Sequence, residues 1–232
     1  MSLKLISWNI NMFRPDKPEL EKDIISELNK QVDDSDIIIL IESSYGFVNN
    51  LLKTSIKKKY VELKKFSVSH GGIINILHKN KIKDIQHIDV ESPVLLIKFN
   101  IDGKTIFLGG CHLAPFSENS EKRLQELLIV RSVVPLNSNL ILVGDMNIRE
   151  KETKFLEKEN NIMQLKDSGD KRKTWYRAFF DGTSYHITSR FDRLFISPNM
   201  KINKFELFGK KFKEKKMTLL SDHMAIKAEI TL

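Results

Sequence analysis

Residues 139–147 read NLILVGDMN, an apolar run that ends in a glycine, an acid and an amide. A run of this kind is typical of a buried strand, here expected from Asn139 to Asp145. The same plan predicts buried strands at Leu3 to Ile10, at Asp36 to Glu42 (DIIILIE) and at Lys104 to His112. Polar side chains stand at or just after the ends of these apolar runs: Asn9, Glu42, His112, Asp145 and Asn147. Since strand ends that share one edge of a sheet are where α/β proteins build sites, we expect these side chains to converge.

Each of these residues also has an ordinary structural explanation. Asn and Asp end strands and form turns, and a lone His is more often structural than catalytic. Together, however, they offer carboxylate oxygens, amide groups and an imidazole at comparable positions. This combination favours a functional site.

The remaining pattern predicts two helices among several strands. Residues 19–31 carry apolar side chains at helical spacing, and a second helix is expected to open at Ser117 with Leu124, Leu127 and Leu128 on one face. Further strands are expected at residues 60–68, 72–79, 85–90, 93–101, 187–197 and 223–231. Many strands with a few interspersed helices favour an α/β sandwich whose sheets are mixed or antiparallel.

The bulk properties are those of a soluble domain. The chain has 232 residues, 41% of them hydrophobic and 29% charged, with no linker or repeat, so we expect one domain over residues 1–232. No apolar run is long enough to span a membrane, and the first residues lack the plan of a signal peptide. The one cysteine, Cys111, cannot form an internal disulfide. We therefore expect an intracellular protein, nuclear or cytoplasmic and not secreted.

The net charge of +8 is concentrated in basic runs. They lie at Lys57–Lys59, Lys171–Lys173 and Lys210–Lys216. Such runs suit a polyanionic partner, because a Lys near a phosphate releases condensed counterions. Solvated lysines that keep a protein soluble are the alternative, and the charge by itself does not identify a nuclease.

Six short motifs together resemble those of the endonuclease/exonuclease/phosphatase superfamily. In chain order they are SWNIN (7–11), IIILIE (37–42), GGCHL (109–113), GDMN (144–147), FDRLFIS (191–197) and SDH (221–223). None of these motifs is specific alone, whereas the ordered set is. The resemblance implies a four-layer α/β sandwich with two mixed, largely antiparallel sheets flanked by helices. It also implies a phosphodiesterase that uses Mg²⁺, with Mn²⁺ as a substitute.

The resemblance implies a metal ligand and its neighbours. Mg²⁺ prefers hard oxygen ligands and takes few of them from protein. Glu42 would be the principal ligand, with Asn9 close by and Asp222 taking part in the outer sphere.

The resemblance also implies the groups that act on the phosphate. Asp145 would be the general base or orient the attacking water, and Asn147 would contact the phosphate. His223 would touch the scissile phosphate, held and charged by Asp192, and His112 would be a second donor. A surface salt bridge from Asp192 to Arg190 or Arg193 is the alternative to the Asp–His pair.

Within the superfamily, three stretches resemble the catalytic domain of the tyrosyl-DNA phosphodiesterase 2 enzymes. They are HLAPFSENSEKRLQEL (112–127), GDMNIREKE (144–152), and Thr174-Trp175 followed by SRFDRLFIS (189–197). The resemblance places Arg149 near the substrate phosphate. It also makes Trp175 and Phe191 an apolar wall for the terminal nucleotide, with plain core packing as the alternative for both.

The implied activity is cleavage of a 5′-phosphotyrosyl bond at a DNA end, as left by a trapped topoisomerase II. The expected partner is DNA with a blocked 5′ end, with RNA left open, and we expect a monomer that does not act at a membrane. Two departures weaken the substrate assignment: Ile41 stands where the superfamily usually has Gln, and Tyr176 where the tyrosyl-DNA enzymes usually have Asp. Another nuclease of the superfamily, a phosphoinositide or sphingomyelin hydrolase, and a non-catalytic DNA-binding domain stay open as alternatives.

Overall fold

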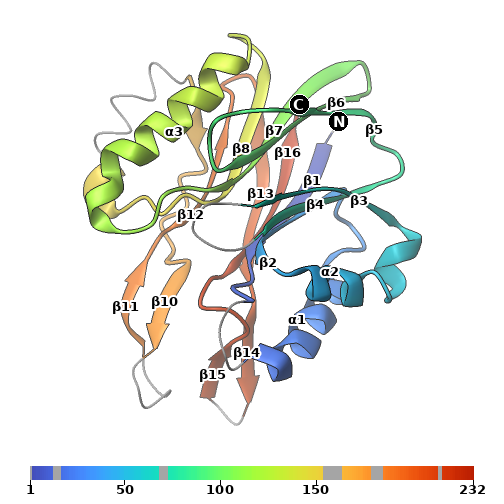
Figure 1. The fold of residues 1–232 in the computed structure, drawn as a ribbon, viewed down its shortest axis with the longest axis vertical. Coiled ribbons are helices and arrows are strands. Elements are labelled where there is room, and N and C mark those ends of the chain that lie inside the picture. The colour runs from blue at the N-terminus through green and yellow to red at the C-terminus, as the bar shows by residue number, and fades with distance from the viewer. Residues whose placement is uncertain (1, 13–16, 68–72, 154–163, 179–184, 214–215) are drawn as a thin grey trace.

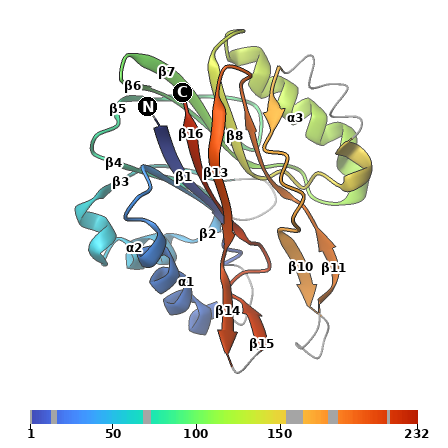
Figure 2. The same ribbon diagram turned by 180° about the vertical axis from the view of Figure 1, so that it is seen from behind.

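Two six-stranded sheets packed face to face, with helices outside them, make up the computed structural model (Figure 1). The structure describes residues 2–12, 17–67, 73–153, 164–178, 185–213 and 216–232. Helices α1 (Lys17–Gln31) and α2 (Tyr45–Leu51) lie on one side of the sandwich, and α3 (Ser120–Val133) lies on the other (Figures 1 and 2). The four-layer α/β sandwich predicted from the sequence is confirmed.

The two sheets share one plan. The first has the order β13-β16-β1-β2-β4-β3, made of Lys201–Phe208, Ala225–Thr231, Ser2–Asn9, Ile37–Ser43, Ile73–Lys79 and Tyr60–Ser67. The second has the order β5-β6-β7-β8-β12-β9, made of Lys83–Ile88, Val94–Ile101, Lys104–His112, Asn139–Asp145, Asp192–Ile196 and Lys166–Asp167. Two short ribbons complete the described strands: β10 (Trp175–Ala178) with β11 (Tyr185–Ser189), and β14 (Lys210–Lys213) with β15 (Lys216–Leu219).

Each six-stranded sheet contains one parallel pair among its described pairings, β1 with β2 and β7 with β8. Parallel neighbours need a crossover connection, and α1 and α3 provide it. As a result, β1, β2, β7 and β8 deliver their carboxyl ends to one end of the sandwich. Both ribbons project from this end, whereas the chain termini lie at the other (Figure 1).

Three apolar clusters hold the layers together. Between the sheets, Ile39 and Ile76 pack with Leu108, Ile141 and their neighbours. The helix layers cover the outer faces: Ile24 and Leu28 of α1 pack in a cluster with Trp8 and Leu40, and Leu127 and Val130 of α3 pack with Leu142. Fully burying such a side chain contributes roughly 1.5–3 kcal/mol to the stability of the fold. The packed core therefore holds the strands, and the polar side chains at their ends, in fixed positions.

Some predicted boundaries need correction. The strand expected at 187–197 is two strands, since the chain leaves the ladder at Arg190 and Phe191. The helix expected from Ser117 begins as a 3₁₀ turn (η2, Ser117–Asn119), and α3 starts at Ser120. Another 3₁₀ turn, η1, spans Ser55–Lys58. No helix within the described ranges is long and apolar enough to cross a membrane.

Candidate active site

The ends of β1, β2, β7 and β8 bring four polar side chains into contact. The Asn9 amide, which is completely buried, donates from Nδ2 to Glu42 Oε1 at 2.9 Å and to Asp145 Oδ2 at 3.1 Å. His112 Nε2 lies 3.3 Å from Glu42 Oε1 and 3.9 Å from Asp145 Oδ2. The convergence expected from the strand-end pattern therefore holds for these residues. Asn9 and His112 offset the mutual repulsion of the two carboxylates.

The backbone at this cluster adopts conformations that side chains rarely take. Glu42, Asn147 and Asn11 have φ of 51°, 51° and 42°. The left-handed region is uncommon for residues other than glycine, and such residues gather at functional sites where the surrounding structure holds them. Here the Asn11 N–H donates to Asn9 Oδ1 at 3.0 Å, and the Met12 N–H donates to the Glu42 carbonyl at 2.9 Å. These bonds fix the turns that follow β1 and β2.

Asp145 is anchored at the junction of β8 with the next turn. Its Oδ1 accepts from the Asn147 N–H at 3.0 Å, while the Asn147 amide donates to the Leu113 carbonyl at 3.0 Å. Gly144 precedes it with φ of 138°, and a Cβ there would overlap the Cys111 carbonyl oxygen. Only glycine lets β8 approach β7 this closely. Burial raises the pKa of the Asp145 carboxyl, although the charges of His223 and His112 act against this shift.

A second pair lies beside Asp145. His223 Nδ1 is 2.9 Å from Asp192 Oδ2, and His223 Nε2 is 3.7 Å from Asp145 Oδ2. Burial lowers the pKa of the imidazole, but the carboxylates of Asp192 and Asp145 outweigh it and raise the pKa to about 10. The alternative salt bridge from Asp192 to Arg190 or Arg193 is not formed, because both guanidinium groups pair with Asp167 instead.

Neighbouring side chains hold the backbone on which this pair stands. Thr174 Oγ1 accepts from the N–H groups of Phe191 and Asp192 at 3.1 and 2.9 Å, which fixes the start of β12. Trp8 Nε1 donates to the His223 carbonyl at 3.0 Å. Trp175 and His223 form an isolated antiparallel bridge, so the first residue of β10 lies directly beside the imidazole residue.

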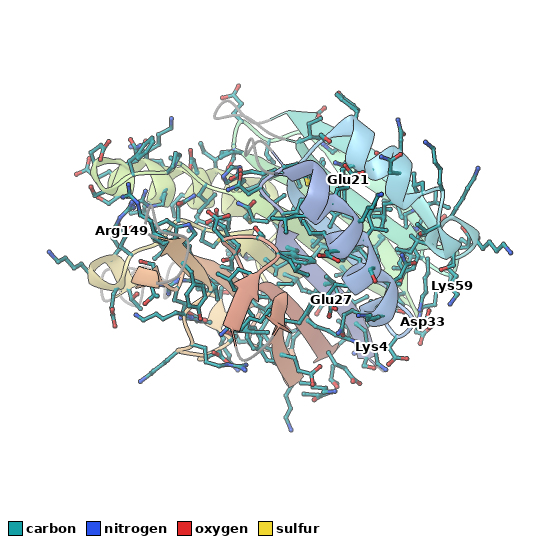
Figure 3. All side chains as sticks on the ribbon, turned by 90° about the horizontal axis from the view of Figure 1, so that it is seen from below. Lys4, Glu21, Glu27, Asp33, Lys59 and Arg149 are labelled. Carbon is teal, nitrogen blue, oxygen red and sulfur yellow. The ribbon has the colours of Figure 1, made fainter. Side chains whose placement is uncertain are left out.

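Trp175, Phe191 and Arg149 form a row next to the pair. The Trp175 and Phe191 rings are tilted by 36° with centroids 5.1 Å apart. The Arg149 guanidinium lies over the Phe191 ring at 5.5 Å. Figure 3 shows Arg149 well away from the α1 residues Glu21 and Glu27. Phe191 is buried and Trp175 is half-buried. This burial agrees both with core packing and with a wall against which a ligand lies.

Asp222 connects this row to the turn after β1, and it belongs to neither of the metal-binding groups found among the described residues. Its Oδ2 accepts from Trp175 Nε1 at 3.1 Å, and its Oδ1 accepts from the Asn11 amide at 2.9 Å. The outer-sphere role suggested for Asp222 stays a prediction.

Comparison with known proteins identifies the group to which this arrangement belongs. The model of the Endonuclease/Exonuclease/phosphatase family matches residues 6–223. The chain belongs to this family. No curated protein matches the sequence.

Solved structures resemble the chain over its whole length. A truncated Caenorhabditis elegans TDP2 superposes with a TM-score of 0.76 and 19% identity, covering 100% of this chain and 98% of that one. D. rerio TDP2 complexed with single strand DNA product gives 0.74 and 19%, with 100% and 99% covered. A family protein from Leptotrichia buccalis gives 0.72 and 16%, with 99% and 100% covered. At these identities the likeness shows the fold.

Two groups of carboxylate and imidazole side chains in the site lie close enough together to hold a divalent cation. One ligand atom each from Glu42, His112 and Asp145 lies within 4.8 Å of the others, and so does one each from Asp145, Asp192 and His223. In the second group the carboxylates of Asp192 and Asp145 raise the pKa of His223, and a protonated imidazole has no lone pair for a metal ion. The first group offers two hard carboxylates, and Glu42 is partly exposed to solvent. This group fits Mg²⁺, which takes one or two carboxylates and completes its shell with water.

Three residues were missed as parts of the site. Asn11 holds Asp222, Thr174 holds the start of β12, and Ser221 Oγ donates to the Asn9 carbonyl at 2.7 Å. All three lie in or next to the sequence motifs described above. Small polar residues are common throughout proteins, so their presence alone does not predict a role in a site.

The basic runs are partly paired in the structure. Lys173 contacts Glu150 at 3.4 Å, Arg172 contacts Asp170 at 2.7 Å, and Lys59 forms an ion pair with Asp33. Within the third run, residues 214–215 lie outside the described residues.

Proposed function

We propose that this protein is a Mg²⁺-dependent phosphodiesterase that hydrolyses the 5′-phosphotyrosyl bond at a nucleic-acid end, with DNA as the principal substrate. The observation that carries the proposal is the row of Trp175, Phe191 and Arg149 directly beside the Asp145–Asp192–His223 cluster. Aromatic faces stack on any base and a guanidinium suits a phosphate, so the row fits a terminal nucleotide. The cluster would then receive the phosphate that bears the tyrosyl group.

The chain's own residues divide the hydrolysis between them. Asp145 orients a water molecule and accepts its proton as the water oxygen attacks phosphorus. His223, fixed through Nδ1 by Asp192, donates from Nε2 to a phosphate oxygen, and His112 and Asn147 are further donors. The bond between phosphorus and the tyrosyl oxygen breaks, giving a 5′-phosphorylated end and a phenolic side chain that takes a proton from solvent.

Glu42 is the residue we expect to hold Mg²⁺, with Asp145 near it and Asn9 orienting both carboxylates. A bound Mg²⁺ supplies charge neutralisation at the phosphate and at the leaving oxygen.

The fold neighbours support this choice of substrate. Among them are TDP2 structures, and the D. rerio protein was solved with a single-stranded DNA product. A nucleic-acid partner also agrees with the net charge of +8, because basic residues strengthen binding to polyanions.

The test is a turnover assay with a 5′-tyrosyl oligonucleotide and the matching plain 5′-phosphorylated oligonucleotide. We expect release of tyrosine only with Mg²⁺ present, and no degradation of the plain oligonucleotide. Digestion of the plain strand at a comparable rate would reassign the protein to a general exonuclease. No release of tyrosine at all would reject the proposal.

A further inference from the structure

Phe116 has a backbone conformation that its residue type should avoid. It lies between β7 and α3 with φ of 69° and ψ of 157°. This region of the φ/ψ map is populated almost only by glycine, and non-glycine residues found in it cluster at ligand clamps and active sites. The side chain gains little burial in return, since 63% of the residue stays exposed. Core packing therefore does not explain it.

Two arginines hold this conformation in place. Arg123 Nη1 donates to the carbonyls of Ala114 and Phe116, both at 2.7 Å, and Arg149 Nη1 donates to the Phe116 carbonyl at 2.8 Å. Arg123 is buried and makes two hydrogen bonds to the Glu152 carboxylate at 3.0 and 2.6 Å. The loop is thus fixed from two sides in the orientation that exposes the ring.

The position of Phe116 extends the row described at the active site. Arg149 contacts the Phe116 backbone through one nitrogen, while its guanidinium lies over the Phe191 ring, which in turn contacts Trp175. Followed contact by contact from His223, the row is therefore Trp175, Phe191, Arg149 and Phe116. Its last member carries an exposed aromatic ring on a backbone that Arg149 holds.

We propose that Phe116 is a stacking platform for a base that lies beyond the terminal nucleotide of a single-stranded nucleic-acid end. The proposal rests on the proposed function, since it takes the row to be the nucleotide side of the site. Successive bases of a single strand stack on successive aromatic rings with little preference for sequence, while basic residues follow the backbone. Arg149, between Phe191 and Phe116, is placed to meet the phosphate that joins two such nucleotides.

The test measures binding without turnover, so that it does not depend on the tyrosyl reaction. A series of 5′-phosphorylated single strands of increasing length is titrated against the wild type and Phe116→Ala, with fluorescence anisotropy as the readout. In the wild type, extension beyond the first nucleotide should tighten binding. In Phe116→Ala that gain should shrink about tenfold, the size expected for one base stacked on an aromatic ring.

A coupling measurement identifies the base. Abasic sites are placed at each position after the first in turn. One of these abasic sites should weaken strand binding by the wild type about as much as the Phe116→Ala change does. The same abasic site should not weaken strand binding by Phe116→Ala any further. Additive losses at every position would overturn the proposal, as would an unchanged length dependence in Phe116→Ala.

Two further variants separate stacking from stability. Phe116→Trp should keep the gain with length. Phe116→Gly should bind as weakly as Phe116→Ala yet melt at a higher temperature, because glycine tolerates this backbone conformation. If Phe116→Gly restores binding, the ring is not the platform. If the strands bind as described but no tyrosine is ever released, the proposed reaction fails and this inference stands.

Discussion

Glu42 combines a partly exposed carboxylate with a left-handed backbone at the end of β2. Such a conformation costs on the order of 1–3 kcal/mol, and here the bonds from Asn9 and Met12 hold it. The strain is understandable if the carboxylate must point toward a cation between the strand ends.

We therefore predict that Glu42→Gln loses at least about a hundredfold in turnover while its melting temperature changes little, because the amide keeps the shape but not the anionic oxygen. Turnover is measured over a Mg²⁺ titration. Glu121→Gln, an exposed change of the same type on α3, is the matched control and should behave as the wild type. Activity close to the wild type in Glu42→Gln would eliminate Glu42 as the main ligand.

A second prediction for individual residues concerns the contact between His223 and Asp192. If His223 donates to an oxygen that gains charge in the transition state, His223→Asn should lower the single-turnover rate far more than substrate affinity. Asp192→Asn should show the same pattern to a smaller degree, since it removes only the support at 2.9 Å. Circular dichroism checks that both variants fold. The role fails if binding weakens while the single-turnover rate is untouched.

The identities of these residues were predictable, whereas several of their contacts were not. Strand-end position and motif order identified Asn9, Glu42 and Asp145, because a short apolar strand determines where its last side chain lies. The contacts of Asp222 with Trp175 and Asn11 bring together residues 47 and 211 positions apart, and no local pattern encodes them. The conformation of Phe116 was equally hidden, since its carbonyl is held by Arg123 and Arg149, 7 and 33 positions away.

Among the elements, the parallel pair β7 and β8 sets the position of the Asp145 carboxylate. Gly144 is the residue that permits their close approach, because a side chain there would meet the Cys111 carbonyl and Ile41.

Gly144→Ala should therefore lower the free energy of unfolding by about 2 kcal/mol or more, because alanine is strained at this positive φ and its Cβ meets the backbone. The change should also reduce activity, because it shifts Asp145. The matched control is Gly103→Ala in the turn between β6 and β7, with φ of 75° and nothing within 4 Å of its added Cβ. That change should cost about 1 kcal/mol and leave activity intact. Urea denaturation measures both. Equal losses in the two variants would show that the approach of the strands is not the constraint.

Prediction of elements succeeded where burial was one-sided or complete. β7 and β8 have the expected bounds, since a short continuous apolar run between polar residues is typical of a buried strand. β13 was not expected, because this edge strand has mostly exposed or half-buried side chains and gives no alternation. The break between β11 and β12 was missed because it depends on partners far away in the sequence. The Phe191 N–H donates to Thr174 Oγ1, and the Arg190 guanidinium pairs with Asp167.

At the scale of the whole molecule, the family fold fixes the chemistry more firmly than the substrate. About 20% identity to TDP2 structures at TM-scores near 0.75 supports the sandwich and leaves specificity to side chains around the site. We propose that Trp175, Phe191, Arg149 and Phe116 are those side chains here. Such a row suits the bases of a free single-stranded end, because aromatic rings stack on unpaired bases.

The most direct test of this account offers a 5′-tyrosyl oligonucleotide and a duplex with an internal abasic site to the purified protein in one tube with Mg²⁺. Gel electrophoresis follows both substrates over time. The account predicts that the tyrosyl group is removed first and that the abasic strand stays intact over the same period. Faster cutting of the abasic strand would contradict the account, leaving the family membership without the tyrosyl substrate.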